Sequence, residues 1–219
     1  MRSSGPSASE NKAQGPGPAG EALPGWHDRS LAARQRFLEL AVRQTPRAKI
    51  QEWAECLGLA VADSFTQVGE AELAFAYDLA VFTALPGRSR AVDRMAKQFL
   101  TLEGEAALVL NGLLRAWVSV FRVLGPHPEA GFILEDVLRG GEVWVLDQGL
   151  AESAEPGAIL AARLARVCGF AITSGVLATL DEERLASFRA VLNESGLDAA
   201  ALAEDPRFIT ALWQHALQT

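Results

Sequence analysis

The stretch from Gly131 to Gly175 constrains the fold most, because there the apolar residues stop recurring at helical spacing and form short, β-branched runs. The four runs cover residues 131–138, 142–147, 158–167 and 168–175. Arg139-Gly140-Gly141 separates the first two, and a Gly-Gly pair between two apolar runs is typical of a β-hairpin. Four short strands at this spacing predict a small antiparallel sheet or part of a barrel.

On both sides of this stretch the apolar residues recur at spacings of three and four, which predicts helices. The predicted helices cover residues 30–45, 46–61, 70–85, 88–102 and 105–124 before the stretch, and 182–193, 198–203 and 206–217 after it. The segment 105–124 is the most apolar of them, so we expect a long helix that is buried on most sides.

The predicted fold class is therefore α+β, with a mainly helical N-terminal part, a β unit at 131–178 and closing C-terminal helices. We expect two regions, a helical one at 29–124 and one at 125–219 that holds the β unit and the closing helices. We further expect these two regions to pack together as one globule.

Residues 1–25 are rich in Gly, Pro, Ser and Ala and contain few large apolar side chains. Such a segment cannot bury enough apolar surface to offset the entropy that ordering it would cost. We therefore expect residues 1–28 to form a disordered tail. The alternative is that Leu23 and Trp26 dock on the domain as a short anchor, together with the helix that follows.

The formal net charge is -7, from 27 acidic and 20 basic residues. Nucleic-acid affinity comes mainly from cations that neutralise phosphates, so this balance argues against a general nucleic-acid binder, although a local basic patch is compatible with it. The most apolar window, 106–124, contains Arg115 and Arg122, and we therefore expect a buried helix and no membrane span.

Cys56 and Cys168 lie far apart in the sequence, in apolar surroundings and without a metal-binding spacing. This pattern predicts two buried thiols in a reducing cytoplasm, with a disulfide between them as the alternative. The three histidines are scattered, so local spacing shows no zinc site. We expect neither a metal nor another cofactor.

The common signatures of nucleotide-binding loops, serine hydrolases and zinc proteases do not occur in the sequence. Acidic residues do cluster in the β stretch, where a hairpin can bring Asp136 and Asp147 close to each other or to Arg163, as acid/base catalysis would need. The alternative is that the two aspartates bind turn amides or pair with Arg139 and Arg163. Asp136, Asp147 and Arg163 are thus the catalytic candidates, and we favour a protein that is not an enzyme.

The clearest positive cluster of this acidic chain consists of Arg88, Arg90, Arg94 and Lys97. Spacings of four, three and seven residues place Arg90, Arg94 and Lys97 on one side of a helix. This side is a candidate site for an anion or a partner. The alternative is a solvated helix face whose cations pair with acids elsewhere, such as Glu103 or Glu105.

Two parts of the chain resemble segments of uncharacterised bacterial proteins. The first part is Ala74-Phe-Ala-Tyr-Asp-Leu-Ala-Val-Phe82 with Arg90-Ala-Val-Asp-Arg94, and the second runs from Leu134-Glu-Asp-Val-Leu-Arg-Gly-Gly-Glu142 through Pro156-Gly157 and Ala161-Ala-Arg163 to Gly169-Phe170. In some of those proteins a similar β module lies beside a zinc-binding SEC-C motif. The resemblance implies a shared fold. Residues 205–219 hold one histidine and no cysteine, so the zinc motif is absent here and the resemblance transfers neither zinc binding nor catalytic residues.

The sequence therefore favours an uncharacterised bacterial protein of the cytoplasm that acts as a non-enzymatic interaction or adaptor protein. It would act through contacts with a protein partner or with a second copy of itself. The alternative is a small-ligand-binding protein or an enzyme that uses the acidic and arginine residues of the β unit.

Overall fold

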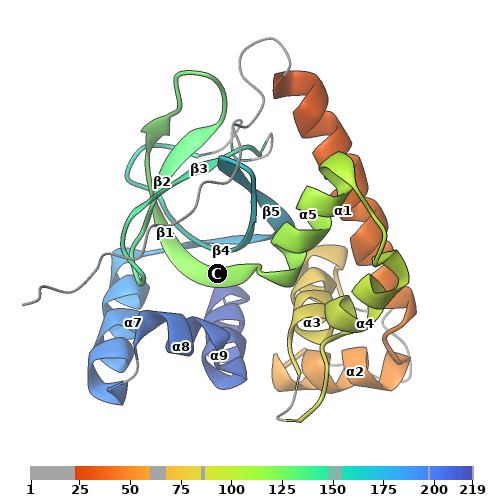
Figure 1. Ribbon diagram of the computed structural model, residues 1–219. Coiled ribbons are helices and arrows are strands. Elements are labelled where there is room, and N and C mark those ends of the chain that lie inside the picture. The colour runs from red at the N-terminus through yellow and green to blue at the C-terminus, as the bar shows by residue number, and fades with distance from the viewer. Residues whose placement is uncertain are drawn as a thin grey trace, which may run out of the picture.

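The structure, a computed structural model, describes residues 23–59, 68–84, 87–147, 150, 154–196 and 198–218. Five strands form a closed barrel, with one group of helices beside it and a second group beneath it (Figure 1). The predicted α+β class, with helices at the C-terminus, is confirmed. Most of the predicted tail, residues 1–22, lies outside the described residues.

The strands are β1 (Trp117–Pro126), β2 (Phe132–Asp136), β3 (Glu142–Val145), β4 (Ile159–Val167) and β5 (Phe170–Leu180). The helices before the barrel are α1 (Leu23–Arg43), α2 (Arg47–Cys56), α3 (Glu70–Phe82), α4 (Ala91–Ala96), the 3-10 turn η3 (Lys97–Phe99) and α5 (Gly104–Leu114). Those after it are α7 (Glu182–Ser195), α8 (Ala199–Glu204) and α9 (Pro206–Ala216). Among the described helices, none has the length and apolar character that crossing a bilayer requires.

The strand order around the barrel is β1-β2-β3-β5-β4, and β4 closes the ring against β1. Neighbouring strands are antiparallel except β3 and β5, which run parallel and meet at Val145 and Ala171. This arrangement is that of the OB fold, a five-stranded Greek-key barrel. The hairpin predicted at Gly140-Gly141 joins β2 and β3, and the predicted partial barrel is in fact a closed one.

The predicted helix at 105–124 is wrong in its second half. Helix α5 ends at Leu114, and strand β1 begins at Trp117. Val120 of β1 packs against the helices outside the barrel, whereas its neighbour Phe121 fills the barrel interior. Both faces of β1 are buried, so its sequence is apolar throughout. The periodicity of apolar residues does not distinguish such a strand from a buried helix.

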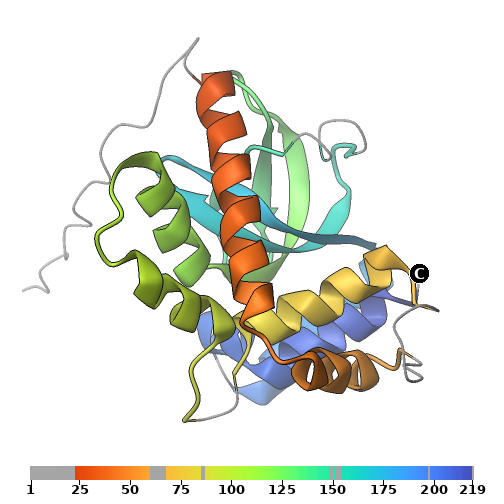
Figure 2. The same cartoon turned by 90° about the vertical axis from the view of Figure 1, so that its right-hand side faces the viewer.

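The N-terminal helix starts earlier than predicted. α1 begins at Leu23, so residues 23–28 belong to this helix and not to the predicted tail. Trp26 is buried, and its ring meets the ring of Phe170 in β5 edge-on, with 4.9 Å between the centroids. Figure 2 shows α1 running along the barrel from end to end. At Trp26 the chain therefore follows the alternative prediction, in which this residue docks on the domain.

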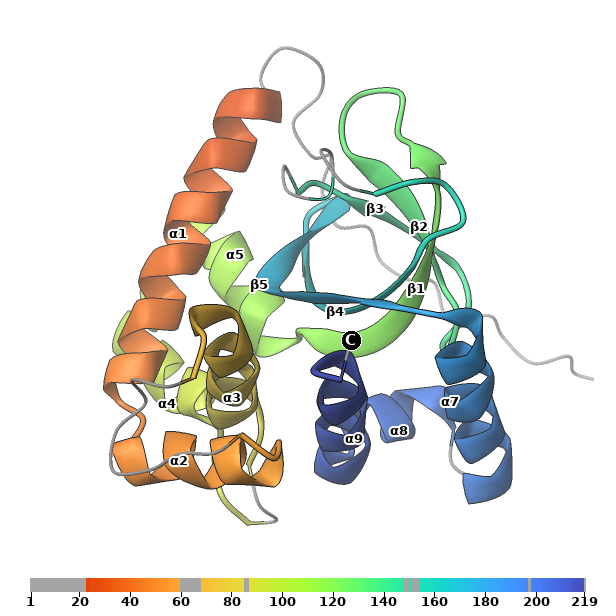
Figure 3. The ribbon, with the colours of Figure 1, turned by 180° about the vertical axis from the view of Figure 1, so that it is seen from behind.

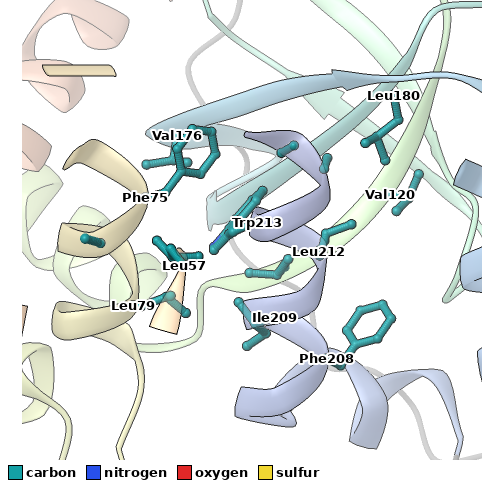
Figure 4. Close-up of a cluster of buried hydrophobic side chains, with 14 of the residues drawn as sticks. Leu57, Phe75, Leu79, Val120, Val176, Leu180, Phe208, Ile209, Leu212 and Trp213 are labelled. Atoms are coloured by element: carbon teal, nitrogen blue, oxygen red, sulfur yellow. The ribbon is translucent and has the colours of Figure 1, made fainter. Parts of the chain in front are cut away.

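Three clusters of buried apolar residues hold these layers together. One fills the barrel, one joins α1, α4 and α5 to the strands, and one joins α2, α3, α7 and α9 to the opposite part of the barrel wall. Seen from behind, α7, α8 and α9 lie beneath the barrel (Figure 3). Trp213 of α9 is fully buried in the third cluster, 5.2 Å from the ring of Phe75 in α3 (Figure 4).

Candidate functional site

A cavity lies at the end of the barrel where β1 begins and β2 and β4 end. It has a volume of about 680 Å³, and its walls come from α5 on one side and from the barrel on the other. We call it the Trp117 cavity. Its polar lining includes Asn111, Arg115, Trp117, Asp136, Arg139 and Arg166.

Asp136 fixes the position of Trp117 in this cavity. The Asp136 side chain is buried and accepts a hydrogen bond from the Trp117 indole nitrogen at 3.1 Å. It also accepts hydrogen bonds from the Ser119 hydroxyl and from the backbone N–H of Arg139 at 3.0 Å. The carboxylate therefore ties the start of β1 to the turn between β2 and β3.

Three arginines from different parts of the chain surround Trp117. Arg115 lies in the link between α5 and β1, Arg139 in the β2–β3 turn, and Arg166 near the end of β4. The guanidinium carbons of Arg139 and Arg166 lie 5.6 and 5.7 Å from the centroid of the indole, within the range of cation–π attraction. The ring thereby helps to hold both groups over the cavity.

These three arginines are exposed, and within the described part of the chain none of them has a carboxylate within 4.0 Å. By contrast, Arg90 and Arg163 each form a two-point ion pair with an aspartate. The acid of the cavity rim, Glu142, is exposed, and the buried acid is Asp136. The cavity therefore carries three arginines against two acids in a chain whose net charge is -7.

A second cavity, of about 460 Å³, adjoins the first and shares Arg115, Trp117 and Arg139 with it. We call it the Thr83 cavity. Thr83 is buried in its wall, and the Thr83 hydroxyl has no hydrogen-bond partner. A buried hydroxyl without a partner is uncommon, because it has lost its hydration and gained no replacement. Such a group is suited to bind a polar atom of a ligand or a water molecule.

The wall between α5 and β4 depends on a close backbone contact. A Cβ atom at Gly112 would lie 2.6 Å from the backbone oxygen of Arg166. Only glycine allows α5 to approach the end of β4 this closely. The position of Arg166 relative to the helix wall is therefore set by backbone packing.

Cys168 lies in the tight turn between β4 and β5 and lines the Trp117 cavity. Its backbone has a φ of 56°, a left-handed conformation that is uncommon for a residue with a side chain. Burial raises the pKa of the Cys168 thiol. Both cysteines are free, but Cys56 is exposed and Cys168 is half-buried, so the prediction that both thiols are buried is wrong.

The catalytic candidates from the sequence each bind a different group. Asp136 binds Trp117 and Ser119, as described above. Asp147 accepts a hydrogen bond from the Thr173 hydroxyl and one from the backbone N–H of Leu150 at 3.1 Å. Arg163 is buried outside the barrel, where it binds Asp78 of α3. None of the hydrogen bonds between described residues joins Asp136, Asp147 and Arg163 to one another.

The residues of the predicted basic cluster are distributed over a loop, a short helix and a 3-10 turn. Arg88 is exposed before α4, and Lys97 is exposed in η3. Arg90 donates from Nε and Nη2 to Asp93, and its hydrogen bond holds the pKa of the Asp93 carboxyl below its usual value. Arg94 donates to the backbone oxygen of Ser89. Arg88 and Lys97 have no carboxylate partner among the described residues.

The sequence did not single out the residues that form the Trp117 cavity. The sequence places Arg115 in a predicted buried helix, indicates Arg139 only as an ion-pair partner, and has no local charge pattern around Arg166. The three are separated by more than twenty residues each, so no spacing rule connects them. The sequence of β4 does contain one indication of the site. Arg163 and Arg166 are three residues apart, and residues at this spacing in a strand face opposite sides, so the two arginines must have different surroundings.

Residues 34–193 match a family described as "Family of unknown function (DUF7986)". No curated protein matches the chain. No solved structure matches it either.

Proposed function

The chain belongs to this family of unknown function, and we propose that it is a non-enzymatic interaction protein, an adaptor that binds anionic groups of its partner in the Trp117 cavity. The observation that carries the proposal is the set of three exposed arginines, Arg115, Arg139 and Arg166, that surround one indole without carboxylate partners among the described residues.

The physical reason is the cost of holding like charges together. Three guanidinium groups at the edge of one cavity repel each other, and a carboxylate or phosphate between them removes that repulsion and gains charge-assisted hydrogen bonds. Arginine suits this role because its planar fork binds such groups at two points. The acidic remainder of the chain repels anions, which limits binding to this cavity.

Asp136 has a positioning role in this proposal. Its carboxylate orients Trp117 and the β2–β3 turn, and so places Arg139 beside the ring. The alternative, a small-ligand-binding protein, would use the same cavity. An anion in this cavity of about 680 Å³ would bind arginines of the β unit. Asp147 and Arg163, bound to Thr173 and Asp78, have no part in it.

The proposed setting is the cytoplasm, which the two free cysteines support because exposed thiols persist in reducing compartments. A protein partner, or a second copy of the chain, is the form of interaction that the sequence favours. Light scattering of the eluting protein at high micromolar concentration tests the second form, which a purely monomeric elution would contradict.

Anion binding is tested by isothermal titration calorimetry with tripolyphosphate and with a glutamate-rich peptide. We expect the double variant Arg139→Gln, Arg166→Gln to bind either probe roughly tenfold or more weakly than the original protein. The matched control is Arg29→Gln with Arg207→Gln, which removes the same charge from exposed arginines that pair with Glu105 and Asp205. Equal binding by both double variants, or no binding by the original protein, would refute the proposal.

A further inference from the structure

We infer that the anionic partner of the Trp117 cavity is single-stranded nucleic acid, whose backbone crosses from the Trp117 cavity into the Thr83 cavity. This inference rests on the proposed function, because it names the partner of the same site. It depends on the arrangement of the two cavities, the kind of cation that lines them, and the aromatic ring between them.

The first argument is the shape of the site. The two cavities, of about 680 and 460 Å³, share Arg115, Trp117 and Arg139, so they adjoin each other at Trp117. A single small anion would occupy only one of the two cavities. A chain with regularly repeated negative charges can place one charge on each side of the ring.

The second argument is the chemistry of the lining. The unpaired cations are all arginines, which bind phosphate oxygens at two points and offer flat surfaces on which a base can stack. The half-buried indole of Trp117 supports two of these guanidinium groups, those of Arg139 and Arg166, on which a base can stack. Cation groups beside an aromatic ring are the usual components of a site for unpaired nucleotides, because every base has a face that can stack.

The third argument is the Thr83 hydroxyl. It is buried in the second cavity without a partner, and a phosphate or sugar oxygen there would accept its hydrogen bond. Arg90 and Arg163, which also line this cavity, are already bound to Asp93 and Asp78. Those aspartates balance their charges, so neither arginine is free to form a two-point contact with a phosphate.

Two features favour a single strand over other polyanions. The ring lies inside a concave site, where the stacked and paired bases of a duplex cannot reach it. An acidic peptide would bind the arginines through its carboxylates, whereas a nucleotide gains stacking as well.

The acidic character of the chain limits the contact to a few phosphates. Three arginines that each neutralise one phosphate predict a plot of log K against log salt concentration with a slope of about −2, from roughly −0.7 per contact for a single strand. This is a shallow dependence compared with that of general nucleic-acid binders. Glu142, exposed at the rim, opposes the contact, so Glu142→Gln is expected to strengthen binding.

The test is fluorescence anisotropy of end-labelled single-stranded oligothymidylate and oligouridylate at low salt, with an unlabelled duplex, tripolyphosphate and a glutamate-rich peptide as competitors. We expect the single strands to bind, the duplex to compete poorly, and Trp117→Leu and the Arg139→Gln, Arg166→Gln double variant to weaken binding roughly tenfold or more. The Arg29→Gln, Arg207→Gln double variant should bind like the original protein.

Thr83→Val provides a variant that keeps the fold. The change replaces a hydroxyl that has no partner by a methyl group of similar size, so thermal stability is expected to be unchanged or higher, while binding of the single strand weakens several-fold. If tripolyphosphate or the peptide binds at the arginines but the single strand does not outcompete them, this inference is overturned and the proposed function stands. If no anion binds, both are overturned.

Discussion

Asp78 of α3 and Arg163 of β4 form a buried two-point ion pair, in which Nε and Nη2 of the arginine donate to the two carboxylate oxygens at 2.8 and 2.9 Å. Their side chains are 1% and 3% exposed. Trp213 of α9 and Ser174 of β5 donate to the same carboxylate at 3.1 and 3.3 Å. One acid thus connects two helices and two strands, and the guanidinium lies 4.6 Å from the Phe82 ring.

Replacing Asp78 by asparagine should strongly destabilise the fold. Asp78→Asn leaves Arg163 buried without a counter-charge, and we expect the free energy of unfolding in urea to fall by about 3–5 kcal/mol. The double variant Asp78→Leu, Arg163→Met should lose less than the single one, because it removes both charges. A single variant that loses less than about 1 kcal/mol would contradict the structural role of the pair.

The pair of Arg90 and Asp93 should stabilise the fold in a pH-dependent way. The hydrogen bond from Arg90 lowers the pKa of Asp93 in the folded protein below its ordinary value of 3.8. A lowered pKa means that the contribution is present above the ordinary value and is lost as the pH falls through the folded value. We expect Asp93→Asn to lower the free energy of unfolding by about 0.5–1 kcal/mol at pH 7, because a partly exposed ion pair contributes little more than this. Below pH 4 the difference between the variant and the original protein should become smaller.

The pH dependence is measured by urea unfolding at pH 7 and at pH 3. Asp28→Asn is a suitable control, because Asp28 is exposed and its described contact is a long one of 3.7 Å to His27, unlike the two-point ion pair of Asp93. An Asp93→Asn cost that stays the same at both pH values would show that the charge of Asp93 is not its source.

The contact at Gly112 should be intolerant of any side chain. Gly112→Ala would place a Cβ atom 2.6 Å from the backbone oxygen of Arg166, so we expect a loss of about 1–3 kcal/mol in thermal or urea unfolding. Gly169→Ala, in the nearby β4–β5 turn, is the matched control, because a Cβ atom there meets nothing within 4 Å and its φ is not left-handed. That variant should stay within about 0.5 kcal/mol of the original. Equal effects of the two changes would refute the close approach.

Labelling of Cys168 should be slow and should need a high pH. The thiolate is the reactive form, and burial raises the pKa of this thiol above its ordinary value of 9.0, so a smaller fraction reacts at pH 8. In a Cys56→Ser background we compare the pH at which the rate of reaction with iodoacetamide increases. We expect this pH to be higher for the folded protein than for the protein unfolded in urea. The Cys168→Ser variant, which keeps the exposed Cys56, should react faster at pH 8. A Cys168 rate that is the same folded and unfolded would contradict its burial.

The sequence was sufficient for the β2–β3 hairpin and for the helices around the barrel, because these depend on local patterns. Gly140 and Gly141, both with positive φ, mark the hairpin turn directly. The sequence of strand β1 predicts a helix because both faces of the strand are buried, one by helices and one by the barrel interior. The number of layers that cover a segment is a tertiary property, and a buried helix and a doubly covered strand share the same apolar composition.

The candidate site was not predictable for a related reason. Arg115, Arg139 and Arg166 meet only because β1, the β2–β3 turn and β4 end at the same side of the barrel. Asp78 was predictable in principle. It is the only charged residue between Phe75 and Phe82, and Arg163 lies between apolar residues in its strand, so a buried charge in each segment indicates a partner of opposite sign.

The link from α5 to β1 is only two residues long, and the Trp117 cavity lies across it, with the helix wall and Arg115 on one side and Trp117, Arg139 and Arg166 on the other. The site is consequently not a portable property of the barrel. A recombination event that carried β1–β5 into another protein would transfer two of the three arginines, lose the third, and leave one wall behind. Binding in such proteins would thus depend on whether α5, the link and β1 are inherited together. In a barrel of the same topology without α5, selection for this site would not maintain the arginines.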